Sequence, residues 1–152
     1  MNLILWRHAE AEDGAPDLAR ELTDKGRKQA ARMAEWLTPR LPKDVRILVS
    51  PALRARQTAD ALEMDYEVVK EIAPGADAAQ ILASAGWPEA TDTVVVVGHQ
   101  PTLGRVVSLL TIGEEGELTI KKGAIFWIAR RVRGGGAQNV LRAVLSPDLL
   151  RD

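Results

Sequence analysis

The sequence predicts an α/β fold, with three α/β/α layers, a mainly parallel central sheet and an antiparallel C-terminal hairpin or edge. Three observations support this prediction. Three short, continuously apolar runs are typical of strands that are covered on both faces of a parallel sheet. Segments with helical spacing separate these runs. Near the end of the chain, two further β-rich runs flank a glycine turn. The three apolar runs are residues 2–6, 45–49 and 93–97.

The first apolar run is followed by a predicted helix. Thr23 is a suitable N-cap, because its hydroxyl can accept a hydrogen bond from the open first turn of a helix. Pro39 closes the segment, since proline cannot continue a helix. Between these two residues, apolar side chains recur at helical spacing: Ala30, Met33, Ala34 and Leu37.

Two more helices are predicted directly after the other two runs. In SPALRARQTADALE, Ser50 is expected to cap a helix that has Pro51 at its first helical position. In QPTLGRVVSLL, Pro101 stands at an expected helix start. A weaker helical pattern covers residues 76–85. The segment 63–92 that contains it must supply one helix and one short edge strand.

The C-terminal part of the chain has a different pattern. The stretches GAIFWIARR and NVLRAVL flank VRGGG, so two strands are expected around a glycine turn. The short connection favours antiparallel pairing. The predicted order of elements is therefore β-α-β-α-(α)-β-α-β-β.

Length and composition limit the classes of protein to consider. The chain has 152 residues, of which 46% are hydrophobic, so residues 1–152 are expected to form a single compact domain and a monomer. The formal net charge of -1 argues against a nucleic acid or an anionic membrane bound through bulk charge, although a local basic patch stays possible. Without cysteine, the chain has no thiolate chemistry and no disulfide.

No targeting or membrane segment is expected. The apolar stretch 3–6 is too short for the hydrophobic part of a signal sequence, and charged residues follow it at once. No stretch approaches the ~20 apolar residues of a membrane span. We therefore expect a cytoplasmic protein.

Both histidines of the chain follow predicted strands. Arg7 and His8 come after the first strand, Ser50 and Arg54 after the second, and His99 after the third. In open parallel sheets, ligands bind at the carboxyl ends of the strands. Taken singly, a histidine at a strand end is more often structural, and an arginine on a helix is more often solvated. Their joint placement predicts a site.

Two arginines and two histidines suit a phosphoryl group. Guanidinium groups bind phosphate oxygens in a bidentate way, and a neutral imidazole can act as a nucleophile toward phosphorus. A second, protonated imidazole would stabilise negative charge, and helix N-termini would add backbone donors. Two histidines without cysteine make a poor zinc site, so neither a metal nor another cofactor is expected.

These residues resemble the histidine phosphatase superfamily, and most of all its small branch of SixA-type phosphohistidine phosphatases. The family's Arg-His-Gly appears as Arg7-His8-Ala9. LTDKGRKQA at 22–30, SPALRARQTA at 50–59 and VVGHQP at 96–101 resemble three further family motifs, in the family's order. The motifs together span most of the chain.

The resemblance implies a role for each residue. His8 would be the nucleophile that becomes phosphorylated, and Arg7, Arg54 and His99 would form the phosphate pocket, with no metal. Ala9 replaces the family's glycine, which matters only if the backbone there needs a positive φ.

The general acid is a separate question. Larger family members carry an acidic residue before the third main strand, and Glu71 matches that position best; the alternative is a plain surface carboxylate. Glu10, Glu12 and Asp13 lie near His8 in the sequence and compete for the role.

The short segment 63–92 leaves little material for a lid over the site. An open site suits phosphohistidine presented on a protein, such as a phosphotransfer domain. One alternative is a phosphatase of small phosphoesters such as sugar phosphates or nucleotides, and another is a non-catalytic module that binds phosphate or phosphoproteins. A basic stretch could dock an acidic partner, or could only solvate a hairpin; it comprises Lys121, Lys122, Arg130, Arg131 and Arg133.

Overall fold

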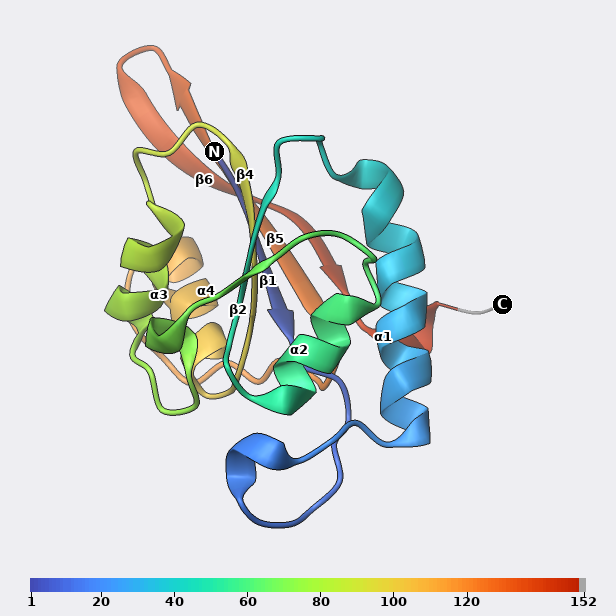
Figure 1. The fold of residues 1–152 in the computed structure, drawn as a ribbon. Coiled ribbons are helices and arrows are strands. Elements are labelled where there is room, and N and C mark those ends of the chain that lie inside the picture. Colours follow the sequence, from blue (N-terminus) through green and yellow to red (C-terminus); the bar gives the residue numbers. More distant parts are fainter. Residues whose placement is uncertain (151–152) are drawn as a thin grey trace.

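The computed structural model describes residues 1–150 and contains one six-stranded sheet with helices on both faces (Figure 1). The strand order is β3-β2-β4-β1-β5-β6. The strands are β1 (Asn2–Arg7), β2 (Arg46–Val49), β3 (Glu67–Val68), β4 (Thr93–Gly98), β5 (Ile125–Arg133) and β6 (Gly136–Leu145). The α-helices are α1 (Asp24–Leu37), α2 (Leu53–Asp60), α3 (Ala78–Ala85) and α4 (Thr102–Ile112). Four short 3-10 helices are η1 (Asp17–Ala19), η2 (Thr38–Arg40), η3 (Lys70–Ile72) and η4 (Pro147–Leu149).

The predicted fold class is confirmed. Strands β3, β2, β4 and β1 run parallel to one another, while β5 is antiparallel to both β1 and β6. The segment before β4 supplies the short edge strand β3 and the helix α3, as expected. Within residues 1–150, no helix is long and apolar enough to cross a membrane.

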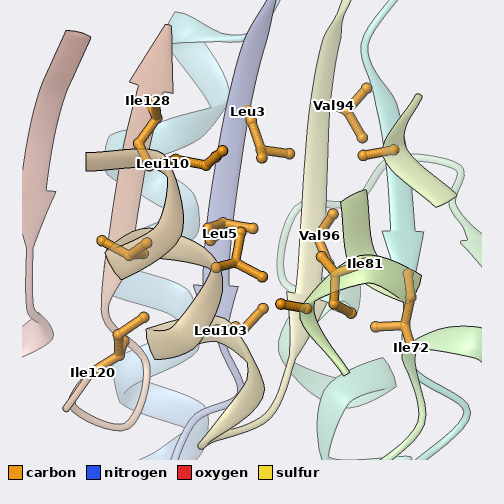
Figure 2. Close-up of a cluster of buried hydrophobic side chains, with 14 of the residues drawn as sticks. Leu3, Leu5, Ile72, Ile81, Val94, Val96, Leu103, Leu110, Ile120 and Ile128 are labelled. Atoms are coloured by element: carbon orange, nitrogen blue, oxygen red, sulfur yellow. The ribbon is translucent and has the colours of Figure 1, made fainter. Parts of the chain in front are cut away.

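The continuous apolar runs are explained by helices on both faces of the sheet. Helices α3 and α4 cover one face, and α1 and α2 cover the other (Figure 1). Along β1, Leu3 and Leu5 point into the first of these layers, and Ile4 and Trp6 into the second. Figure 2 shows the cluster on the α3–α4 side, where side chains of β1 and β4 meet Ile81 and neighbouring apolar residues.

Helix α1 begins as predicted, but α2 does not. The Thr23 hydroxyl accepts a hydrogen bond from the Gly26 amide at 2.9 Å, which confirms Thr23 as the N-cap of α1. Helix α2 begins at Leu53 with Ala52 as N-cap, so the prediction of a Ser50 cap was wrong. Ser50 still continues the sheet, because its amide donates to the Val97 carbonyl at 3.0 Å.

The N-terminus of α4 and the C-terminal hairpin differ slightly from the prediction. Pro101 is the N-cap of α4, one residue before the first helical position. Strands β5 and β6 extend further into the turn than expected. Gly134 and Gly135 form the turn with φ values of 55° and 84°, which glycine adopts without strain and which match a two-residue hairpin turn.

Candidate active site

The structure brings the four predicted residues Arg7, His8, Arg54 and His99 together at the carboxyl end of the parallel strands. Arg7 ends β1 and pairs in register with Gly98, so His8 and His99 leave adjacent strands side by side. Arg54 lies in the first turn of α2. These four side chains share one cavity of about 220 Å³. Its other lining residues are Ala11, Arg20, Pro74, Gln100 and Lys122.

His8 is held in one orientation by the backbone around it. Its Nδ1 atom lies 2.7 Å from the Ala9 carbonyl oxygen. Because a carbonyl only accepts hydrogen bonds, Nδ1 carries the proton and donates it. The neutral ring therefore presents the lone pair of Nε2, for which residues 1–150 offer no hydrogen-bond partner. The His8 amide donates to Gly98 and its carbonyl accepts from Gly123, so the backbone on both sides is fixed as well.

Burial keeps both imidazoles neutral in the site. Desolvation, followed by the charge of Arg54, lowers the pKa of His8 to about 4, despite the opposing hydrogen bond to Ala9. Desolvation, and then the proximity of His8, lowers the pKa of His99 to about 3. The two ring centroids are 5.2 Å apart. We expected a protonated His99, but the site by itself favours the neutral ring.

Three buried side-chain nitrogens have no hydrogen-bond partner in the part of the chain that the structure describes, and all three belong to residues that line this cavity. They are Arg7 Nε, Arg54 Nε and His99 Nδ1. A buried polar atom without a partner is costly, so such atoms are rare in folded proteins. An anion in the cavity would give each of these donors an acceptor.

One further nitrogen of Arg7 and one of His99 are anchored by hydrogen-bond partners. Arg7 Nη1 donates to the Ile120 carbonyl at 2.7 Å. Ser50 Oγ lies 2.7 Å from His99 Nε2. When Nε2 accepts from the Ser50 hydroxyl, Nδ1 of the neutral His99 carries the proton and becomes a donor. The site residues are therefore positioned by the carbonyl and hydroxyl groups behind them.

Sequence reasoning missed Asp17 and Arg20, which come from the loop between β1 and α1. Asp17 binds Arg54 twice, through its carbonyl at 2.8 Å and its carboxylate at 3.2 Å. Arg20 lines the cavity and donates to the Asp17 carboxylate at 3.0 Å. Hydrogen bonds, first from Arg20 and then from Arg54, lower the pKa of Asp17. Asp17 and Arg20 are three residues apart, a spacing typical of ion pairs, and this was the available signal.

The candidate general acids do not line this cavity. Glu71 lies on η3 with an exposed side chain outside the cavity, so its role stays a prediction. The Glu10 carboxylate accepts from the Thr23 hydroxyl at 2.8 Å and lines a neighbouring hollow. Glu12 and Asp13 line another hollow beside the loop. Among residues 1–150, no carboxylate lines the cavity around His8.

Ala9 fits the family's glycine position without strain. Among the non-glycine residues of 1–150, the only positive φ belongs to Glu63. Ala9 is fully buried against Leu22 and Ala30, and its amide donates to the Thr58 hydroxyl at 3.0 Å. The methyl group therefore packs beneath the loop that leads away from His8.

The low pKa of His8 makes stability depend on pH. The unfolded chain binds a proton near pH 6.5 and the folded chain only near pH 4, so stability is full above about pH 6.5 and is lost as pH falls toward 4. This difference corresponds to about 3 kcal/mol of unfolding free energy. Urea unfolding between pH 7 and pH 4 should show a smaller loss for His8→Gln than for the wild type. If the unfolding free energies of the two proteins fell equally with pH, this would contradict a buried, neutral His8 imidazole.

A sheet that brings two histidines and two arginines to its carboxyl edge, around a cavity with unsatisfied donors, defines a phosphoryl-transfer enzyme of the histidine phosphatase class. The chain belongs to the histidine phosphatase superfamily (branch 1), whose family model matches residues 3–77. It is 35% identical over 123 residues to the phosphohistidine phosphatase SixA of Escherichia coli, covering 75% of this chain and 76% of that protein.

Solved structures show the same architecture. The protein histidine phosphatase SixA complexed with tungstate matches with a TM-score of 0.79 and 30% identity, over 99% of this chain and 100% of that one. A phosphoserine phosphatase from Entamoeba histolytica matches with a TM-score of 0.70 over 96% and 97% of the two chains. At 19% identity, the latter shows a shared fold alone.

Proposed function

We propose that this protein is a metal-independent phosphatase that hydrolyses phosphohistidine on a protein through a covalent phospho-His8 intermediate. The observation that carries the proposal is the set of three unpaired, buried donors on the residues around His8. The similarity to SixA phosphohistidine phosphatases supports the same substrate class.

The first step is an in-line attack on phosphorus. Nε2 of His8 forms a bond to phosphorus while the bond from phosphorus to the substrate imidazole breaks. Because Nδ1 is held on the Ala9 carbonyl, the attacking lone pair is available throughout the pH range above the His8 pKa of about 4. Neutral His8 therefore needs no separate base.

The arginines and His99 stabilise the charge that develops on the phosphoryl oxygens. In our proposal Arg7 Nε, Arg54 Nε and His99 Nδ1 donate to these oxygens, which satisfies the unpaired donors. The arginine charges supply what a metal supplies in other phosphatases. Water then attacks phospho-His8, releases inorganic phosphate and restores the free imidazole.

The lack of a carboxylate lining the cavity favours phosphohistidine over alkyl phosphates. An alkoxide leaving group requires a proton in the transition state, which a nearby acid normally provides. Phosphohistidine instead releases a neutral imidazole when its second ring nitrogen is protonated, so the demand for an acid is low. Among residues 1–150, no acidic residue lines the cavity around His8.

Steady-state kinetics on a substrate panel tests this preference. We expect kcat/KM for a phosphohistidine protein to exceed that for an alkyl phosphate by about 100-fold or more, the range that general acid catalysis contributes. Glu71→Gln should change turnover of phosphohistidine by less than about two-fold, because the side chain is exposed and lies outside the cavity.

Three outcomes of these measurements would change the assignment. Equal or faster hydrolysis of sugar phosphates or nucleotides would favour the alternative of a small-phosphoester phosphatase. A large loss of alkyl phosphate turnover in Glu71→Gln would make Glu71 the general acid. Binding of phosphoproteins without any turnover would instead identify a non-catalytic module.

A further inference from the structure

A row of exposed lysines leads away from the active site. The cavity around His8 shares Arg7 and Lys122 with a neighbouring hollow of about 400 Å³. That hollow shares Lys25 with a third one of about 320 Å³, which continues to Lys28. We call the surface formed by Lys25, Lys28, Lys121 and Lys122 the basic groove.

Two elements with fixed positions form this groove. Lys25 and Lys28 are three residues apart on α1, so they lie on the same face of the helix, about 4.5 Å apart along its axis. Lys121 and Lys122 come directly before Gly123, whose amide donates to the His8 carbonyl at 3.0 Å. One end of the groove is therefore attached to the backbone of the nucleophile.

The groove has an excess of positive charge. In its middle hollow, Arg7, Lys25, Lys121 and Lys122 face the carboxylates of Glu10 and Asp148. Two carboxylates do not neutralise these four cations. Lys121 and Asp148 are 3.5 Å apart with both side chains exposed, and Glu10 accepts a hydrogen bond from the Thr23 hydroxyl. Solvent-exposed ion pairs of this kind contribute little stabilisation. The third hollow adds Lys28 to the basic side.

We propose that the basic groove binds an acidic segment of the protein that carries the phosphoryl group. This inference rests on the proposed function, because it names the partner surface that reaches the same site. The cavity around His8 is the volume that takes the phosphoryl group, and the two further hollows are each larger than it. Cations spread over this length match carboxylates along a polypeptide, and charge complementarity mainly raises the rate of productive encounter.

The basic residues of the C-terminal hairpin do not belong to this surface. Strand β5 is antiparallel to β1, so Ile125 pairs with Trp6 near the site while the strand runs away from it toward Arg133. The hairpin tip and the loop after β1 lie at opposite ends of the sheet (Figure 1). Arg131 and Arg133 are exposed and far from the groove, which makes them a matched control.

The test compares two synthetic peptides that carry one phosphohistidine, flanked by glutamates in one and by glutamines in the other. We expect the wild type to show about a ten-fold higher kcat/KM for the glutamate peptide at low salt, through a lower KM. Lys25→Glu/Lys28→Glu should abolish this preference and leave turnover of the glutamine peptide within about two-fold. Arg131→Glu/Arg133→Glu changes the net charge equally and should keep the preference.

Three results would overturn the proposal: no preference in the wild type, a preference that survives in Lys25→Glu/Lys28→Glu, or an equal loss in both double variants. If the wild type dephosphorylates neither peptide, the proposed function fails. The proposal that the basic groove binds an acidic segment is then tested by peptide binding alone. Fluorescence anisotropy with the unphosphorylated glutamate peptide should then show weaker binding for Lys25→Glu/Lys28→Glu only. Equal binding by all three proteins would overturn the groove as well.

Discussion

His8→Ala is expected to lower kcat/KM for phosphohistidine by on the order of 10⁴-fold or more, because the variant lacks the imidazole that forms the covalent intermediate in the proposed mechanism. His8 lines the cavity, and the Ala9 carbonyl holds its ring in the tautomer that leaves Nε2 unprotonated. Dephosphorylation of a phosphohistidine protein under single-turnover conditions measures this loss directly.

Binding of inorganic phosphate provides the control for His8→Ala. The donors on Arg7, Arg54 and His99 remain in the variant, so its affinity for phosphate should stay within about three-fold of the wild type. With the wild type, rapid acid-free quenching should trap label on His8 through an acid-labile bond between nitrogen and phosphorus. Normal turnover by His8→Ala, or label on another residue, would contradict the mechanism.

Gly26→Ala is expected to cause the largest loss of stability among the single substitutions considered. A Cβ atom at position 26 would lie 2.0 Å from the Glu10 carbonyl oxygen, so helix α1 or the loop after His8 must move. The better helix propensity of alanine offsets about 1 kcal/mol. We expect a net loss of about 2–3 kcal/mol, seen as a lower midpoint in urea or thermal unfolding.

Gly136→Ala is the matched control for this substitution. Gly136 begins β6 on the surface, and the nearest atom to an added Cβ is the Arg133 carbonyl oxygen at an ordinary 3.8 Å. The change should stay within about 0.5 kcal/mol. If Gly26→Ala unfolds at the same midpoint as Gly136→Ala, the close packing of α1 on the Glu10 backbone is not important for stability.

The parts of the site that follow strand ends could be predicted from the sequence. Continuous apolar runs identify buried parallel strands, and the geometry of a parallel sheet brings their carboxyl ends to one edge. Arg7, His8 and His99 are therefore found from the pattern alone, and the structure brings them together. Arg54 could be predicted as well, because it lies in the first turn of the helix that follows β2, and this turn starts at the same edge of the sheet.

The loop that completes the site could not be predicted in this way. Asp17 and Arg20 lie in a segment without periodicity, and its return path depends on backbone contacts such as Glu12 to Glu21. The start of α2 was wrong by two residues because Ser50 and Pro51 are typical of a helix start. In this fold, the Ser50 amide remains in the sheet ladder and its hydroxyl contacts His99.

The pairing of β1 with β4 also has a consequence for how the protein folds. Asn2 pairs with Thr93 and Arg7 with Gly98, so the two histidines become neighbours only after about ninety residues of chain have been closed into a loop. Such long-range parallel contacts form slowly compared with local ones. Catalytic activity should therefore return during refolding together with the complete sheet, and a partly folded chain that contains only its helices should have none.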